Sequence, residues 1–281
     1  MGLPPTFLYV SALVIGLCLG SFLNVVITRL PVMLMRQWRN EALESLEQPT
    51  EPAPRFNLAY PPSMCPSCEN AIAWHDNLPL AGWLKRRGRC AHCQTRISPQ
   101  YPVVELMGGV LAVAVLALHG PSVASLFIYG ACLALLALTV IDLRTYLLPD
   151  IITLPLLWAG LLYQLLFQPV MLPSAVWGAM AGYLVLWSFY WLFKLVTGKE
   201  GMGFGDFKLL AALGAWLGWS MLPLLLIVSA GIGAICGLVA QALSPRLRGQ
   251  PLPFGPFLAL AGWIGLLVGD ELMALYLALI Y

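Results

Sequence analysis

Charged residues are scarce in this chain. Only 10% of its 281 residues are charged, whereas 60% are hydrophobic, and the mean hydropathy is +0.82. A soluble domain carries roughly 25% charged residues, so this composition excludes an ordinary soluble protein. A helix that crosses a bilayer needs about 20 apolar residues, and the apolar runs leave room for about eight such helices. We therefore expect an all-α polytopic membrane protein.

Several motifs of other enzyme classes are missing. The chain has no G-x-S-x-G nucleophile elbow and no H-E-x-x-H motif, which disfavours serine and metal-dependent hydrolysis. It also has no P-loop, and no G-x-G-x-x-G sequence follows a strand. The first apolar run lacks a basic leader and continues for the length of a span, so we expect a retained anchor rather than a cleaved signal peptide.

Eight apolar segments are predicted to span the membrane. They are Phe7–Thr28, Val103–His119, Ser122–Ile141, Ile151–Phe167, Ser174–Leu195, Phe207–Trp219, Leu222–Leu243 and Phe254–Ile280. Between the fifth and the sixth, residues 198–205 include four glycines, which predicts a non-helical connection. Non-helical backbone near a membrane is tolerated only inside protein or beside a wet cavity, so this connection is a candidate functional segment.

The basic residues predict the orientation of these spans. Nine of the fifteen Lys and Arg residues lie between Arg29 and Arg96, and with eight spans all fifteen fall on one side. Cytoplasmic loops are enriched in Lys and Arg, so this side is predicted to be the cytoplasm, with both termini outside.

The span pattern also predicts three domains. They are a first transmembrane helix (1–30), a cytoplasmic loop domain (31–102) and a seven-helix membrane core (103–281). The first half of the loop is polar, and a short helix is expected over Trp38–Leu46.

Two C-x-x-C pairs lie in this loop, with 21 residues between them. They are formed by Cys65 and Cys68 and by Cys90 and Cys93. Two such pairs facing each other supply the tetrahedral sulfur ligands that Zn²⁺ prefers. A reducing cytoplasm disfavours disulfides, and no thioredoxin-like pattern surrounds the pairs. The sequence therefore predicts a structural four-cysteine zinc site.

Few carboxylates lie near the predicted membrane face. Asp142 follows the third span, Asp150 comes eight residues later, and Asp206 ends a GxGD sequence with Gly203 and Gly205. Ionisable groups beside spans are costly and usually functional. Two carboxyl groups that share a proton can hydrolyse a peptide, because one activates water while the other donates to the scissile carbonyl. We predict Asp142 and Asp206 as this pair, with Asp150 as the next candidate.

A structural interpretation of these residues stays open. Asp142 could pair with Arg144, and Asp206 with Lys208, as simple ion pairs. Lys208 could instead support the ionised dyad, or anchor a helix end at the interface. Glu105, at the start of the second span, is a further candidate for polar support.

Glycine has a specific predicted role beside Asp206. Without side chains, Gly203 and Gly205 would let a substrate strand approach the backbone closely.

Several blocks together resemble the type IV prepilin peptidase family, also called leader peptidase/N-methyltransferase. Besides the cysteine loop, these blocks are Gly20–Val25, Arg29–Pro31, Ile97–Leu106, Ile141-Asp142, Leu148–Asp150 and Gly203–Leu209. They are spread over most of the chain, which makes the resemblance far more specific than the GxGD match alone.

The resemblance implies a GxGD aspartic endopeptidase of the bacterial inner membrane, with Asp142 and Asp206 as its catalytic pair. Such enzymes remove the short basic leader of type IV prepilins or type II secretion pseudopilins at the cytoplasmic face. Members with the cysteine loop typically also methylate the new N-terminal amine with S-adenosylmethionine. No Rossmann-like fingerprint supports methylation independently, and the sequence does not identify the residues that bind the methyl donor.

Other interpretations lead to different expectations. A peptidase without methyltransferase activity would leave its product unmethylated. A presenilin-like GxGD protease would lack the cysteine loop, and a proton-coupled transporter would carry carboxylates deep within inverted repeats. A zinc-loop scaffold would tolerate loss of either aspartate. As for partners, the basic run Lys85–Arg89 is expected to face anionic lipid, and no nucleic acid is expected.

Overall fold

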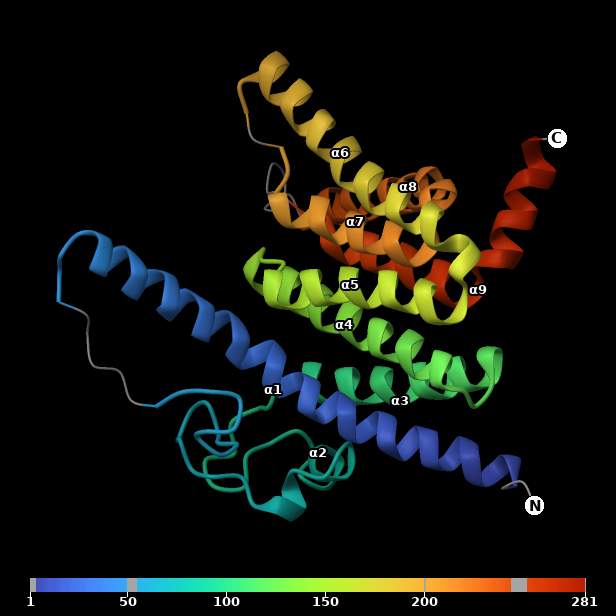
Figure 1. Ribbon diagram of the computed structural model, residues 1–281. Coiled ribbons are helices and arrows are strands. Elements are labelled where there is room, and N and C mark those ends of the chain that lie inside the picture. The colour runs from blue at the N-terminus through green and yellow to red at the C-terminus, as the bar shows by residue number, and fades with distance from the viewer. Residues whose placement is uncertain (1–3, 50–54, 200, 244–251, 281) are drawn as a thin grey trace. The chain divides into compact units, whose positions relative to one another are not determined.

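The structure, a computed structural model, describes residues 4–49, 55–199, 201–243 and 252–280 (Figure 1). These residues form helices joined by short connections, and no strand occurs among them. The chain divides into two compact units after Ala117. Two of the basic residues behind the predicted orientation, Arg246 and Arg248, lie outside the described residues.

The first unit contains two long helices and a loop with little regular structure. Its elements are α1 (Pro5–Ser45), the 3-10 turn η1 (Trp74–Asp76), α2 (Ala81–Lys85) and most of α3 (Gln100–His119).

Helix α1 is longer than the sequence predicts. Instead of a span followed by a separate short helix over Trp38–Leu46, one helix of 41 residues runs through the buried Pro31. A proline removes one backbone hydrogen bond, and residues 32–45 are rich in strong helix formers, so the helix continues past it. The loop therefore leaves α1 after Ser45 rather than at Pro31.

Helices α1 and α3 approach each other at glycines. A Cβ atom at Gly16 would lie only 2.7 Å from the carbonyl oxygen of Gly108, so a larger residue would push the two backbones apart. Nearer the loop, the buried Asn24 donates from Nδ2 to the carbonyl oxygen of Tyr101 (3.0 Å).

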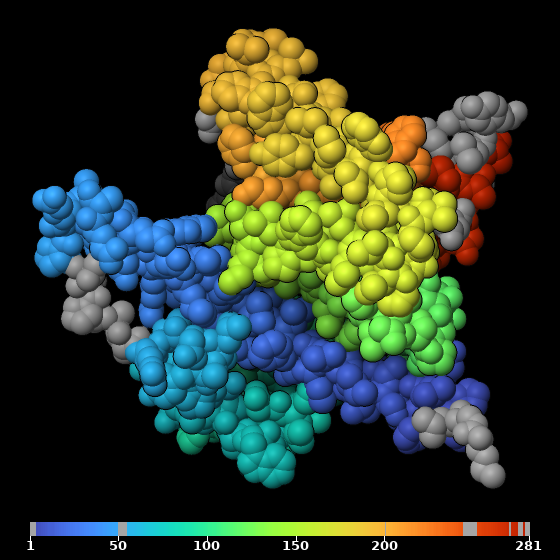
Figure 2. Space-filling model, in the orientation of Figure 1, coloured from blue at the N-terminus to red at the C-terminus, as the bar shows by residue number. Residues whose placement is uncertain are grey.

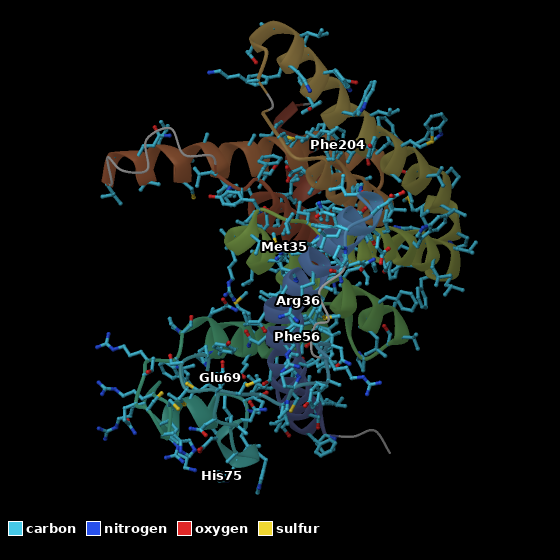
Figure 3. The ribbon with its side chains drawn as sticks, turned by 90° about the vertical axis from the view of Figure 1, so that its left-hand side faces the viewer. Met35, Arg36, Phe56, Glu69, His75 and Phe204 are labelled. Carbon is cyan, nitrogen blue, oxygen red and sulfur yellow. The ribbon has the colours of Figure 1, made fainter. Side chains whose placement is uncertain are left out.

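Residues 55–60 of the loop return to α1. Arg29 donates from Nη1 to the carbonyl oxygen of Asn57 (3.0 Å). The guanidinium of Arg36 lies over the ring of Phe56, with its Cζ 4.7 Å from the ring centroid (Figure 3). These contacts hold the start of the loop against the C-terminal half of α1.

In its described residues, the second unit is a bundle of six helices. They are α4 (Val123–Thr145), α5 (Asp150–Phe167), α6 (Leu172–Thr197), α7 (Phe204–Leu217), α8 (Leu222–Leu243) and α9 (Gly255–Ile280), with 3-10 turns η2 (Pro169–Met171) and η3 (Trp219–Met221). Local signals set several ends: the Ser122 hydroxyl oxygen accepts from the Ser125 amide (3.1 Å), and Gly198 ends α6 with φ +70°. The predicted non-helical connection is confirmed for residues 198–199 and 201–203, whereas its last two residues, Phe204 and Gly205, already belong to α7.

Helix α7 is the core of this unit. It packs against α5, α6 and α9, and all its residues from Leu209 to Trp216 are buried. Helices α6 and α7 come closest at Gly178 and Gly214, where a Cβ atom on either glycine would overlap the carbonyl group of the other. A short helix that is apolar on every face needs this complete enclosure.

Within the described residues, helices occupy all eight predicted span positions, and six of them are long and apolar enough to cross a bilayer. The exceptions are α7, with 14 residues, and α9, whose apolar part Gly255–Gly269 ends where the backbone leaves the helical conformation at Val268. Helix α6, which runs from yellow to gold in Figure 2, has exposed rings such as Trp177 and Phe189, as expected for a surface in lipid. The predicted all-α polytopic membrane fold is confirmed.

Candidate functional site

Two aspartates of the second unit come together where α4 ends and α7 begins. Asp142 lies in the last turns of α4, Asp206 lies in the first turn of α7, and their residues are only 5% and 7% exposed. Their carboxyl groups are close enough for the two charges to interact. The structure thus joins two carboxylates that are 64 positions apart in the sequence.

The start of α7 differs from its predicted position. The predicted span began at Phe207, whereas the helix begins at Phe204, so Asp206 is its third residue. The Asp206 amide donates to the carbonyl oxygen of Gly203 (3.2 Å). A carboxylate in the first turn interacts favourably with the helix dipole. The Oδ1 atom of Asp206 is nevertheless buried without a hydrogen-bond partner among the described residues. An unpaired buried acceptor is costly, and is typical of a site that pairs with a ligand or water.

Asp142 is oriented by a residue that the sequence analysis missed. Gly255, the first residue of α9, donates its amide hydrogen to Oδ2 of Asp142 (3.1 Å). A Cβ atom at Gly255 would lie 2.6 Å from the same oxygen, so only glycine fits without moving the carboxylate. The only signal in the sequence was the Gly-Pro pair at Gly255, which comes before an apolar run. Such a pair indicates the start of a helix but does not show that Gly255 binds Asp142.

Leu148 packs between the two glycines beside the dyad. A Cβ atom at Gly205 would lie 2.7 Å from Leu148 Cβ, and one at Gly255 would lie 3.1 Å from Leu148 Cδ2. Leu148 therefore occupies the space beside Gly205 in which the sequence analysis expected a substrate strand. Gly203 remains open, because the nearest atom to its Cβ position is Oδ2 of Asp206 at 3.9 Å.

The ion pairs near the site differ from the simplest sequence expectation. Lys208 binds Asp150, with Nζ 2.7 and 2.6 Å from the two carboxylate oxygens, so it joins α7 to the start of α5 instead of pairing with Asp206. Asp142 and Arg144 are two residues apart on a helix, so they point to different faces. Ion pairs with Arg144 and Lys208, the basic residues nearest in the sequence, therefore do not explain why Asp142 and Asp206 are buried.

The four cysteines of the first unit form one cluster. Their sulfur atoms all lie within 4.8 Å of one another, with 3.7 Å between Cys65 and Cys93 and 3.9 Å between Cys68 and Cys90. Sulfur atoms around a tetrahedral Zn²⁺ with bonds of about 2.3 Å are about 3.8 Å apart, so the donor set fits this ion. Hydrogen bonds with Thr95 lower the pKa of the Cys93 thiol to about 6, which favours the thiolate that binds metal, whereas burial and the neighbouring thiols raise the pKa of the Cys68 thiol to about 11.

The two C-x-x-C pairs have the same backbone arrangement. Each lies in a tight hairpin closed by one antiparallel bridge, Met64 opposite Ala71 in the first and Arg89 opposite Arg96 in the second. The sequence shows the spacing of the cysteines but not this repeated geometry.

Glu105 lies in the first unit and supports the loop. Its residue is 8% exposed, and Oε2 accepts a hydrogen bond from the Leu80 amide (2.8 Å). Leu80 has φ +56°, a conformation that is unfavourable for leucine, so the carboxylate stabilises a strained turn just before α2.

Two family models match the chain. The Bacterial Peptidase A24 N-terminal domain matches residues 14–119, and the Type IV leader peptidase family matches residues 128–238. The boundary between them falls close to the division between the two structural units. No solved structure matches the chain at a significant level.

Similar curated proteins carry the name prepilin leader peptidase/N-methyltransferase. The one from Aeromonas salmonicida (strain A449) is 52% identical over 99% of this chain and 97% of its own length. The one from Stutzerimonas stutzeri is 50% identical over 97% and 95%, and that from Pectobacterium carotovorum subsp. carotovorum is 50% identical over 91% of each. Identity at this level over nearly the whole length, joined to the enclosed aspartates and the cysteine cluster, shows that the chain belongs to the type IV leader peptidase family.

Proposed function

We propose that this chain is a membrane aspartic endopeptidase that removes the basic leader peptide of type IV prepilins or type II secretion pseudopilins. The observation that carries the proposal is the pair of buried aspartates at the junction of α4 and α7 in a chain of this family. The names of the similar proteins support the same substrate class.

Asp142 and Asp206 act as the catalytic pair in this proposal. One carboxylate removes a proton from the attacking water, while the other, protonated, donates to the scissile carbonyl oxygen. Asp142 suits the role of base, because the Gly255 amide stabilises a carboxylate at Oδ2. Asp206 suits the role of acid, because its Oδ1 atom has no donor among the described residues, and its other oxygen, Oδ2, is the atom nearest to the open Gly203. The pH profile belongs to the pair, since the two groups share a proton.

The location of the pair suits a substrate with its own membrane helix. Such a substrate keeps its apolar helix in the bilayer and presents the leader junction at the interface, level with helix ends such as those of α4 and α7. We propose that this is the cytoplasmic face, because Lys and Arg residues are concentrated in the loops on that side. Basic side chains of the cysteine loop would contact anionic lipid there.

The cysteine cluster and the names of the relatives support two further parts of the proposal. Cys65, Cys68, Cys90 and Cys93 would hold a structural Zn²⁺, which stabilises a loop with little core of its own. S-adenosylmethionine would supply a methyl group to the new N-terminal amine; the word N-methyltransferase in the names of the similar proteins supports a methylation step.

The test is leader removal from a purified prepilin in detergent, measured by mass spectrometry. Asp142→Asn and Asp206→Asn should each abolish cleavage while thermal stability and metal content stay unchanged. Asp150→Asn is the matched control, because this carboxylate binds Lys208 and lies outside the pair; it should retain most activity.

Normal cleavage by either dyad variant would contradict the assignment. With S-adenosylmethionine added, the mature product should gain the mass of one methyl group. An unchanged mass would leave a peptidase without methyltransferase activity.

A further inference from the structure

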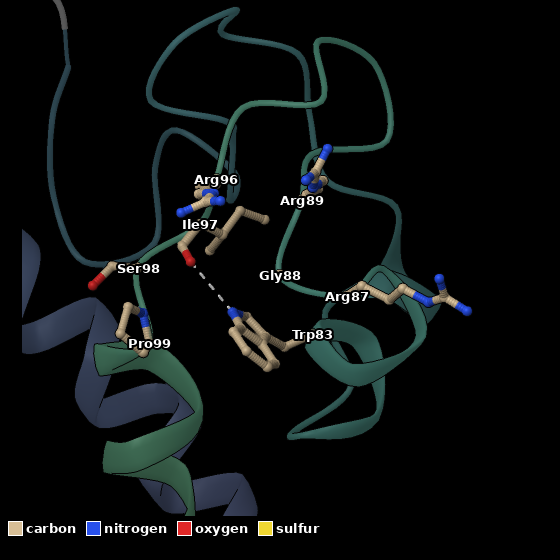
Figure 4. A pocket seen from close by; sticks show the side chains of 8 residues that line it. All are labelled: Trp83, Arg87, Gly88, Arg89, Arg96, Ile97, Ser98 and Pro99. Carbon is tan, nitrogen blue, oxygen red and sulfur yellow. Dashed lines mark hydrogen bonds between the residues drawn. The ribbon is translucent and has the colours of Figure 1, made fainter.

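The loop of the first unit contains a cavity of about 400 Å³ next to the second C-x-x-C hairpin (Figure 4). Three of the residues that line it are arginines, Arg87, Arg89 and Arg96, and none is a carboxylate. Nothing in the proposed peptide hydrolysis uses this cavity.

The arginines of the cavity lack the partners that their neighbours have. Lys85 and Arg86 both bind Asp76, at 3.0 and 2.6 Å, and these bonds lower the pKa of Asp76 to about 2. This carboxylate is therefore ionised and fully engaged at neutral pH. The basic run Lys85–Arg89 is therefore divided: Lys85 and Arg86 share the carboxylate of Asp76, whereas Arg87 and Arg89 have no ion pair in the described part of the chain.

Two of the three arginines are held opposite each other. Arg89 and Arg96 form the antiparallel bridge of the hairpin, and like charges directly opposite on such a bridge are destabilising. An anion between the two guanidinium groups would remove this repulsion. Guanidinium groups bind phosphate oxygens with two parallel hydrogen bonds, which makes phosphate a well-matched anion.

A rigid aromatic ring forms the floor of the cavity. Trp83 donates from Nε1 to the carbonyl oxygen of Ile97 (3.4 Å), the dashed line in Figure 4. Gly88 has φ +67° and lies against the indole, since a Cβ atom there would be 2.7 Å from Cζ2 of Trp83. Arg89 and Arg96 therefore belong to a cavity with a fixed floor rather than to a random stretch of charged surface, whereas the side chain of Arg87 points away from Trp83 (Figure 4).

The cavity lies at the end of a membrane helix. Pro99 lines it, and α3, one of the helices able to cross a bilayer, begins at the next residue, Gln100. Lipid phosphates lie where such a helix leaves the hydrocarbon region, and Trp and Arg are typical residues of this interface.

We propose that this cavity binds the phosphodiester headgroup of an anionic phospholipid, with Arg89 and Arg96 as the phosphate ligands and Trp83 as the floor. The site deepens the proposed lipid contact of the loop and is independent of the catalytic pair. Its role is to hold the cysteine loop at the membrane surface.

The test measures binding of phosphatidylglycerol to the full-length protein in detergent by native mass spectrometry. Phosphatidylcholine with the same chains and inorganic phosphate serve as comparisons. Each basic side chain near an anionic surface contributes about 1 kcal/mol, so Arg89→Ala with Arg96→Ala should weaken phosphatidylglycerol binding roughly 30-fold. The charge-matched control, Arg55→Ala with Lys199→Ala, removes two exposed cations that do not line the cavity and should change binding less than about threefold.

A double lysine variant separates the effect of charge from the effect of the guanidinium geometry. Arg89→Lys with Arg96→Lys keeps both charges but loses the forked donors, so binding should fall to an intermediate value. The metal content of each variant shows whether the cysteine loop is folded. If the double alanine variant loses its metal, the affinity of the double lysine variant for phosphatidylglycerol tests the proposal in its place.

Three results would overturn the proposal. The first is equal binding of phosphatidylglycerol and phosphatidylcholine, and the second is wild-type affinity for phosphatidylglycerol in a double variant that keeps its metal. The third is saturation of the cavity by inorganic phosphate alone. Prepilin cleavage by the same variants in detergent should be unchanged. A protein that binds phosphatidylglycerol as expected but cleaves no prepilin would contradict the proposed function and not this site.

Discussion

Replacing Gly255 with alanine would place a methyl group against the proposed base. The new Cβ atom would lie 2.6 Å from Oδ2 of Asp142 and 3.1 Å from Cδ2 of Leu148, whereas ordinary contacts begin at 3.4 Å. The carboxylate must therefore move by about 0.8 Å or rotate away, and its hydrogen bond from the Gly255 amide is distorted. Both obstructing atoms are ends of side chains, so we expect the helices to stay in place.

The expected loss of activity follows from this displacement. A shift of about 1 Å in a reacting group costs roughly 100-fold in rate, which corresponds to about 2.7 kcal/mol in activation free energy. The loss should appear mainly in kcat, because the change affects the reacting carboxylate rather than the surface that binds the leader. The pH profile of cleavage should also change, since the hydrogen bond that stabilises the Asp142 carboxylate is distorted.

The assay is prepilin cleavage in detergent by Gly255→Ala, compared with wild type over a range of pH. Gly130→Ala is the matched control. Gly130 lies on α4 with Asp142, and no atom lies within 4 Å of its Cβ position, so this variant should cleave prepilin at the normal rate. Cleavage by Gly255→Ala within about threefold of wild type, with an unchanged pH profile, would refute the proposed role of this amide.

Three further predictions concern stability and metal binding. Cys68→Ser should abolish or strongly weaken zinc binding, because it removes one of four clustered ligands; elemental analysis of the purified protein checks this, and a full zinc content would contradict the four-cysteine site. Gly214→Ala should destabilise the second unit by about 1–3 kcal/mol, because its Cβ would overlap the Gly178 carbonyl group, and thermal unfolding in detergent should show the change. Lys208→Ala should cost less than about 1 kcal/mol, because its pair with Asp150 is partly exposed; a large loss of stability would show that this ion pair has a structural role beyond its contact.

The features that the sequence predicted well have local or periodic signals. Long apolar runs predicted helices at all eight positions, because the bilayer demands about 20 such residues for each crossing. The spacing within each C-x-x-C pair predicted the sulfur cluster, because two thiols on one turn already face the same ion. The boundaries were predicted less well: the first span was expected to end at Thr28 and the loop domain to begin at residue 31, yet the helix continues 14 residues beyond Pro31.

Contacts between distant residues could not be predicted in this way. Gly255 is 113 residues from Asp142, and nothing in the local sequence of either one identifies the other as its hydrogen-bond partner. The same holds for Lys208 and Asp150, which are 58 residues apart and form a pair because α7 packs against α5. Lys208 has Asp206 much nearer in sequence, but positions two apart on a helix do not face each other.

The amino-acid sequence by itself determined the membrane class, the helices, the cysteine cluster and the identity of two unusual carboxylates, because each follows from composition or from the spacing of a few neighbouring residues. Only the tertiary structure decided what those carboxylates contact, which glycines serve packing rather than access, and which arginines lack a partner. These properties depend on the packing of helices from distant parts of the chain, where a backbone amide or a single side chain fills space that no sequence pattern describes.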